Sequence, residues 1–130
     1  MIEVYTDGGY SSKRDQGGWA FVVVKNNEKI HSSCDGIINT TNNRMELQAI
    51  MEATKWLQEN NIEEATIITD SMYCLGCLVK GWQRKKNVDM WEIMDGLNFN
   101  YEIKHVKGHS GDKWNSHCDM LAVHATQLIL

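Results

Sequence analysis

Thr41-Asn42-Asn43-Arg44-Met45-Glu46-Leu47, residues 41–47, begins a long helical pattern and separates a strand-rich beginning of the chain from a part in which helices and strands alternate. Mostly apolar side chains then recur at helical spacing on one stripe, and Asn60-Asn61 ends the pattern. We predict a helix over residues 43–59 that buries this stripe. Its members are Leu47, Ile50, Met51, Thr54 and Leu57.

Three strands are expected before this helix. Residues 2–6 alternate in the manner of a strand, and residues 19–24 form an apolar run that is consistent with a strand buried on both faces. Asn26-Asn27 is a turn signal, so residues 29–37 can return as the hairpin partner of the second strand.

Two strands and three helices are expected after the long helix. The strands are residues 65–69 and 101–106, and the helices are residues 71–79, 87–97 and 115–130. This order of elements predicts an α/β fold in which helices pack on a mixed sheet. The last helix should bury one face, formed by Cys118, Leu121, Ala122, Ala125 and Leu128.

Four acidic residues stand at the ends or starts of these elements. Asp7 ends the first strand, Glu46 lies near the start of the long helix, Asp70 ends the fourth strand, and Asp119 lies early in the last helix. Carboxylates at the ends of different elements can converge in a fold. A cluster with about four negative charges repels itself unless cations bind it. The pattern therefore predicts a divalent-metal site for phosphoryl chemistry.

Each acid also has a purely structural explanation. Asp7-Gly8 can form a turn, and Asp70 can cap the helix that follows it. Asn43-x-x-Glu46 and Ser116-x-x-Asp119 both have the pattern of a capping box, in which the acid binds the start of its own helix. The residues around the acids, and their order, favour the metal site.

Seven short stretches around these acids carry a family resemblance. They are Tyr5-Thr6-Asp7-Gly8-Gly9, Gly17-Gly18-Trp19-Ala20, Thr41-Asn42-Asn43-Arg44-Met45-Glu46-Leu47, Thr69-Asp70-Ser71, Asn87-Val88-Asp89-Met90-Trp91, Val106-Lys107-Gly108-His109-Ser110-Gly111 and Cys118-Asp119-Met120-Leu121-Ala122. In this order they resemble ribonuclease H of type 1, the nuclease that cuts RNA in RNA–DNA hybrids. The resemblance spans nearly the whole chain.

The resemblance implies a ribonuclease H-like fold with five strands in the order 3-2-1-4-5, the second strand antiparallel to the rest, and helices on both faces. It also implies an endonuclease that hydrolyses the RNA strand of RNA–DNA hybrids and leaves 5′-phosphate and 3′-hydroxyl ends. Two Mg²⁺ ions would serve this reaction, with Mn²⁺ as a possible substitute.

Roles for the acids follow from the same resemblance. Asp7 would bridge the two ions. Glu46 and Asp70 would hold the ion that activates water, and Asp70 and Asp119 would hold the other. His109, between two glycines of a loop, would assist proton transfer or product release.

Recognition of the hybrid is implied at further positions. The 2′-OH group that distinguishes RNA from DNA would be read at Gly8, Asn42 and Asn43. A phosphate of the DNA strand would lie at Thr41 and Asn87.

Basic residues would strengthen binding of the hybrid. Lys13 or Arg14 would support the phosphate contact, and Trp82, inside the basic segment 80–86, would pack on a sugar or base. Many family members carry a longer Lys- and Trp-rich insertion at this place. We therefore expect this chain to hold the hybrid more weakly.

Composition fits one domain over residues 1–130, since 42% hydrophobic residues are enough for a single core. The formal net charge is −4, which the four site acids alone account for.

The four cysteines, Cys34, Cys74, Cys77 and Cys118, contain a single C-x-x-C pair. Because a structural zinc site would need two more ligands, reduced thiols are the favoured interpretation.

The chain starts directly with a strand pattern rather than a signal peptide, and its apolar runs fall short of the ~20 residues that cross a bilayer. We expect a cytoplasmic monomer whose partner is an RNA–DNA hybrid, without membrane association.

Two alternative functions stay open. Another nuclease or strand-transfer enzyme on the same fold would share the acids but usually lacks the Asn-Asn-Arg-Met-Glu and Gly-His-Ser-Gly pairing. A catalytically silent hybrid-binding module would be expected to have lost an acid.

Overall fold

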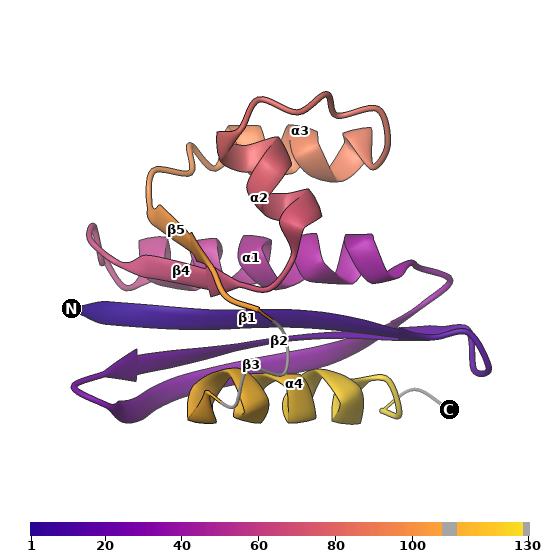
Figure 1. Cartoon of the computed structure of the whole chain (residues 1–130), viewed down its shortest axis with the longest axis horizontal. Coiled ribbons are helices and arrows are strands. Elements are labelled where there is room, and N and C mark those ends of the chain that lie inside the picture. Colours follow the sequence, from indigo (N-terminus) through magenta and orange to yellow (C-terminus); the bar gives the residue numbers. More distant parts are fainter. Residues whose placement is uncertain (108–111, 129–130) are drawn as a thin grey trace.

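A mixed sheet forms the middle layer of this computed structural model, which describes residues 1–107 and 112–128 (Figure 1). Every helix and strand predicted from the sequence is present. In chain order they are β1 (Ile2–Ser11), β2 (Gln16–Lys25), β3 (Glu28–Ile38), α1 (Asn42–Glu59), β4 (Thr66–Thr69), α2 (Met72–Val79), α3 (Val88–Gly96), β5 (Glu102–His105) and α4 (Lys113–Ala125).

The sheet has the strand order β3-β2-β1-β4-β5. β2 pairs antiparallel with β1 and β3, whereas β4 pairs parallel with β1 and β5. This confirms the order and directions that the family resemblance implied. The central strand β1 carries Asp7, and its parallel neighbour β4 leads directly into Asp70.

Helices cover both faces of the sheet. α1, α2 and α3 lie on one face and α4 lies on the other (Figure 1). The larger apolar cluster includes Leu47 and Trp91, and the smaller one includes Cys118 and Ala122 from α4. Because β2 lies between these layers, residues 17–24 are all buried, which explains their apolar run. None of the helices in the described ranges is long and apolar enough to cross a membrane.

Local signals in the sequence predicted several details correctly. The stripe of α1 is buried from Leu47 to Leu57. Asn26 and Asn27 have φ angles of 53° and 59°, the left-handed pair that joins two antiparallel strands in a tight hairpin.

β1 is longer than predicted. It continues past Thr6 to Ser11 because its pairing with β2 runs as far as Gln16. Asp7-Gly8 therefore lies inside a strand, and the turn alternative for this pair is wrong.

α4 differs from its prediction at both ends. It begins at Lys113 rather than Asn115, because the side chain of Asp112 accepts hydrogen bonds from two backbone N–H groups of the first turn. It ends at Ala125, so Leu128 falls outside the helix and is 48% exposed instead of buried.

Two glycines let helices approach the sheet closely near the acids. A Cβ atom on Gly8 would lie 2.3 Å from the backbone nitrogen of Glu46 in α1. A Cβ atom on Gly18 would lie 2.4 Å from the carbonyl oxygen of Ala122 in α4. These contacts set how near α1 and α4 come to β1 and β2, and hence where Glu46 and Asp119 lie.

Candidate active site

Three acidic side chains from different elements meet beside the central strand. Asp7 comes from β1, Glu46 from the start of α1, and Asp70 from the residue after β4. Each offers a carboxylate oxygen, and these oxygens lie within 4.8 Å of one another. Among the residues that the structure describes, this is the one group of three or more His, Cys, Asp and Glu side chains close enough to share a metal ion.

Asp119 reaches the same place from the helix on the other face. Its carboxyl group is close enough to Asp7 to contribute to the raised pKa of that residue. It also lines a cleft of about 60 Å³ together with Asp70, Asn115 and Ser116. The fold thus brings all four acids singled out in the sequence to one place, three of them in a tight group and the fourth beside it.

Glu46 is directed toward β1 and away from the start of its own helix. The Gly8 N–H donates to Glu46 Oε1 at 2.5 Å and lies 2.9 Å from Asp7 Oδ1. The cap of α1 is Thr41, whose Oγ1 accepts from the Arg44 N–H at 3.2 Å. The capping-box alternative for Glu46 is therefore wrong.

Asp70 and Asp119 are not helix caps either. The cap of α2 is Ser71, whose Oγ accepts from the Cys74 N–H at 3.1 Å. The cap of α4 is Asp112, which leaves Asp119 in the middle of the helix. Both acids are thus free for another role.

The acids are close enough to repel one another. Burial, followed by the charge of Asp70 and the nearby carboxyl group of Asp119, raises the pKa of Asp7 to about 8. Burial, followed by the charges of Asp7 and Asp70, raises the pKa of Glu46 to about 11. Without a cation, the cluster therefore retains protons at neutral pH.

The donor set fits a hard divalent cation. Clustered carboxylate oxygens are the ligands that such cations prefer, and a cation would offset the burial and the repulsion that together raise the two pKa values. Asp70 Oδ1 is buried without a hydrogen-bond partner in the described part of the chain. A buried oxygen left in this way is costly, so a ligand at this position would stabilise the site.

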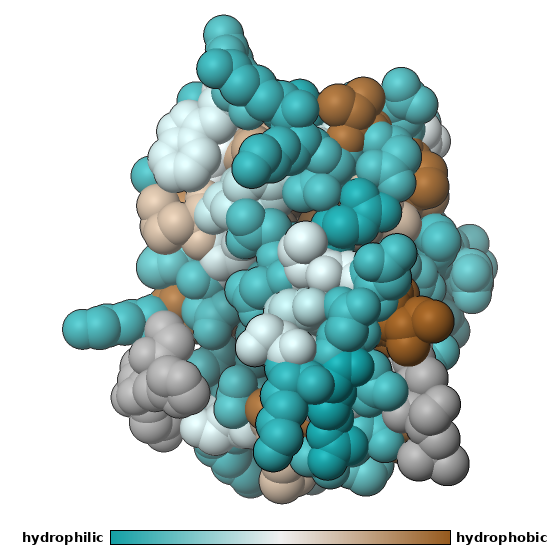
Figure 2. All heavy atoms as spheres, turned by 90° about the vertical axis from the view of Figure 1, so that its right-hand side faces the viewer, coloured by the Kyte–Doolittle hydropathy of each residue, from teal (hydrophilic) through white to brown (hydrophobic). Residues whose placement is uncertain are grey.

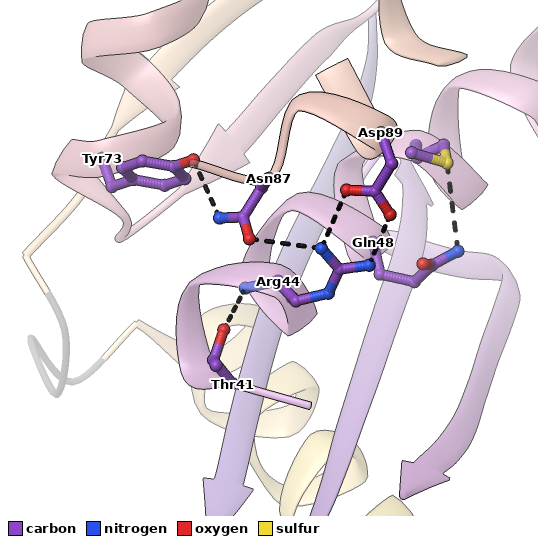
Figure 3. A network of polar contacts seen from close by, with 7 residues as sticks. Thr41, Arg44, Gln48, Tyr73, Asn87 and Asp89 are labelled. Atoms are coloured by element: carbon purple, nitrogen blue, oxygen red, sulfur yellow. Dashed lines mark hydrogen bonds and ion pairs between the residues drawn. The ribbon is translucent and has the colours of Figure 1, made fainter. Parts of the chain in front are cut away.

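The residues expected to contact the hybrid gather at one end of the molecule. Thr41, Asn42 and Asn43 are exposed at the start of α1, and Asn87 immediately precedes α3. Arg44 joins these two helix starts, since its Nη1 donates to Asn87 Oδ1 at 3.2 Å (Figure 3). Gly8, by contrast, lies beside the acids in β1.

Lys13 and Arg14 are exposed in the turn between β1 and β2. This turn projects at the same end of the molecule as the starts of α1 and α3 (Figure 1). Seen from that end, the surface is mostly hydrophilic, with a few scattered apolar residues (Figure 2). The surroundings suit a polar, charged ligand.

Trp82 is fixed on the surface. One side of its ring packs on Gly76, where a Cβ atom would lie 2.1 Å from the indole, and the side chain is still 47% exposed. Lys80, Lys85 and Lys86 are exposed around it. The basic segment therefore presents lysines and one indole face to solvent.

Arg84 has a structural role in this segment. Its guanidinium pairs with Asp95 at 2.7 Å, donates to the carbonyl oxygen of Cys77, and lies 4.4 Å from the centre of the Trp91 ring. Arg84 is one of the four basic residues of the basic segment 80–86, and these contacts show that it is not a free cation. The pattern of charges alone cannot show that one of four basic residues is already paired.

His109 lies outside the described residues, so its role stays a prediction. Sequence reasoning missed Asn115, which is 4% exposed and lines the cleft with Asp70 and Asp119. The available signal was its spacing, because Asn115 precedes Asp119 by four residues and so shares a helix face with it.

Comparison with known proteins agrees with this geometry. Residues 1–127 match the family model described as RNase H. A ribonuclease H from Rippkaea orientalis is 38% identical over 97% of this chain and 85% of its own length. A ribonuclease H from Treponema denticola is 32% identical over 99% of both chains.

Solved structures share the fold. LC11-RNase H1 in complex with an RNA/DNA hybrid superposes with a TM-score of 0.83 at 21% identity, covering 98% of this chain and 97% of that one. The N-terminal RNase H domain of rv2228c from Mycobacterium tuberculosis, solved as a fusion with maltose-binding protein, gives a TM-score of 0.84 at 20% identity over 97% of this chain and 93% of that one. By its sequence match over almost the whole chain, this protein belongs to the RNase H family.

Proposed function

We propose that this protein is a Mg²⁺-dependent endonuclease that hydrolyses the RNA strand of RNA–DNA hybrids. The observation that carries the proposal is the group formed by Asp7, Glu46 and Asp70, with Asp119 beside it. Relatives named ribonuclease H, and the similar LC11-RNase H1 structure with its RNA/DNA hybrid, support the choice of substrate.

The four acids would hold the metal ions, for which Mg²⁺ is the hard cation of choice and Mn²⁺ a possible substitute. Bound Mg²⁺ would make an attacking water more acidic and take up charge on the leaving oxygen. Because the pKa of Asp7 is about 8 and that of Glu46 about 11, these carboxyls must release their protons as the cations bind. Activity should therefore rise with pH through the neutral range.

The protein's own part is to hold the acids in place and to seat the hybrid. Gly8 fixes the Glu46 carboxylate through its N–H, which leaves the Gly8 carbonyl as the group that can accept from a 2′-OH. Asn42 and Asn43 would read the same hydroxyl from the start of α1. Thr41 and Asn87 would bind a phosphate of the DNA strand.

Cleavage of an end-labelled RNA–DNA hybrid tests the proposal, with DNA–DNA and RNA–RNA duplexes as controls. We expect cuts within the RNA strand, 5′-phosphate ends, and no cleavage in EDTA. Asp7→Asn keeps the size of the side chain but removes a ligand charge, so activity should fall by orders of magnitude while the circular dichroism spectrum stays native. Full activity of Asp7→Asn, or equal cleavage of the three duplexes, would contradict the proposed function.

A further inference from the structure

Asn87 does not cap the helix that it precedes. Its backbone is left-handed (φ 60°, ψ 34°), and its side chain makes no capping hydrogen bond to α3. The amide instead lies between two other side chains (Figure 3): Arg44 Nη1 donates to Oδ1 at 3.2 Å, and Nδ2 donates to the Tyr73 hydroxyl at 3.0 Å. Asn87 is thus tied to α1 on one side and to α2 on the other.

These partners decide which way the amide points. A guanidinium can only donate hydrogen bonds, so the Asn87 carbonyl oxygen must face Arg44. The Tyr73 oxygen accepts from Trp91 Nε1 as well, at 3.0 Å, and an indole also only donates. Since the Tyr73 oxygen accepts two hydrogen bonds, its own hydrogen is directed elsewhere.

The network leaves hydrogen-bond donors unused. One Nδ2 hydrogen of Asn87 and the hydroxyl hydrogen of Tyr73 have no acceptor within the described part of the chain. Thr41 Oγ1 accepts from the Arg44 N–H, so the Thr41 hydroxyl hydrogen is also available. Amide and hydroxyl donors are common partners of backbone phosphates. The surface formed by Thr41, Tyr73 and Asn87 therefore suits an anion, although these three residues offer no positive charge.

Arg44 is poorly placed to supply such a cation. Its two Nη groups bind the carboxylate of Asp89 at 3.0 and 2.8 Å, and its side chain is 31% exposed. In this bidentate pair the charge of Arg44 is already compensated. A phosphate would have to displace Asp89 to reach it.

We propose that Arg44, held in place by Asp89, is a positioning residue that turns the Asn87 amide so that its N–H meets the phosphate of the DNA strand. Without Arg44 the amide can rotate and present its carbonyl oxygen, which repels an anion. The inference rests on the proposed function, because that function places the DNA strand at Asn87.

Asp89→Asn separates this role from direct phosphate binding by Arg44, because the two predict opposite signs. If Arg44 contacted the phosphate itself, removing its counter-charge would strengthen hybrid binding. If Arg44 positions Asn87, binding weakens even though the variant removes a negative charge from a surface that meets a polyanion. We expect about three- to tenfold weaker binding, the factor that one hydrogen bond supplies, with KM raised equally and kcat nearly unchanged.

Asp95→Asn is the matched control. Asp95 lies on the same helix as Asp89, and its side chain is similarly exposed (63% against 67%). The variant removes the same charge and also breaks an ion pair with an arginine, the 2.7 Å contact between Asp95 and Arg84. We expect binding that is unchanged or slightly stronger. If both variants weaken binding equally, the effect belongs to the stability of α3, and the role of Arg44 is refuted.

A second pair of variants tests whether Arg44 acts through Asn87. Arg44→Gln should weaken binding in the wild-type background and add nothing in Asn87→Ala, because contacts that act in series are not additive. Additive losses would refute the proposal.

Binding is measured by fluorescence anisotropy of a labelled hybrid at low salt in EDTA, so that no cleavage occurs. Steady-state cleavage with Mg²⁺ then gives KM and kcat. A wild-type protein that binds the hybrid but does not cut it contradicts the proposed function alone. If the wild-type protein cuts the hybrid but Asp89→Asn binds the hybrid as well as or better than wild type, the role of Arg44 is refuted and the proposed function stands.

Discussion

Replacing Asp70 with Asn should make the metal-free protein more stable, although it removes a residue of the active site. Asp70 Oδ1 has no hydrogen-bond partner in the described part of the chain, and the Asn amide keeps an oxygen that can still accept from a protonated Glu46. The exchange does remove one charge from the acidic group. The expected gain is therefore a direct measure of the repulsion within the site.

The size of the gain follows from the geometry. The carboxylate oxygens of Asp7, Glu46 and Asp70 lie within 4.8 Å of one another. Two unit charges at that separation repel by about 3 kcal/mol when the effective dielectric constant is about 20. The full repulsion between Asp70 and Asp7 applies only where Asp7 is ionised, above its pKa of about 8.

The pH dependence has a definite sign. The pKa of Asp7 is higher in the folded protein, about 8, than its ordinary value of 3.8, so the folded state binds the proton more tightly. The wild-type protein in EDTA therefore loses stability as the pH rises from about 4 through 8. Asp70→Asn lowers the folded pKa of Asp7 and reduces this loss. We expect a gain of about 3 kcal/mol at pH 9 and much less at pH 6.

Urea unfolding followed by circular dichroism at both pH values measures the gain. Glu92→Gln, which makes the same charge change at an exposed position of α3, should stay within about 0.5 kcal/mol of wild type. Excess Mg²⁺ should stabilise wild type by mass action and Asp70→Asn much less, so the difference between them shrinks or reverses. A metal-free Asp70→Asn protein that is less stable than wild type at pH 9 would refute the reasoning.

Two further tests each compare a residue with a structural role with a control substitution. Gly8→Ala should lower the free energy of unfolding by at least about 2 kcal/mol and reduce activity, because its Cβ would lie 2.3 Å from the backbone of α1. Gly9→Ala is the control and should be nearly neutral, because its Cβ would meet nothing within 4 Å. Equal stabilities of the two variants would contradict the close contact at Gly8. Arg84→Ala should lower the melting temperature, because it loses its ion pair, its carbonyl contacts and the Trp91 stacking. The double replacement of the exposed Lys85 and Lys86 by Ala should instead raise KM and make the salt dependence of binding shallower without changing the melting temperature; the reverse pattern would show that Arg84 is the binding residue.

Much of the fold could be predicted because its signals are local. The stripe that ends at Leu57, the apolar run of residues 19–24 and the Asn26-Asn27 turn each report on a few neighbouring residues, and all three are confirmed. Strand order is different, because pairing of β1 with β4 joins residues about sixty positions apart. The family resemblance supplied that order, and spacing alone did not.

The site, like the fold, combines features that the local sequence predicts with features that depend on distant residues. The acids could be selected from the sequence because each stands next to an element boundary, but the choice between cap and ligand depended on distant partners. Glu46 binds Gly8, 38 residues away, and not its own helix start. Asp112 caps α4 ahead of Ser116, because the helix begins two residues earlier than the apolar pattern suggested. The Arg84 pair with Asp95 was likewise invisible in a run of basic residues.

The acidic group also constrains how the rest of the molecule must be built. Above the pKa of Asp7, about 8, repulsion of about 3 kcal/mol between the ionised Asp7 and Asp70 tends to move β4 away from β1 when no cation is bound. Burying one large aliphatic side chain contributes about 1.5–3 kcal/mol, so one or two such residues offset the repulsion of one ionised pair. Leu47 and Ile50 in α1 and Ile67 in β4, all fully buried, lie in the elements that carry Glu46 or lead into Asp70. The apolar core beside the site therefore does more than fold the chain, because it holds the carboxylates together before the cation arrives.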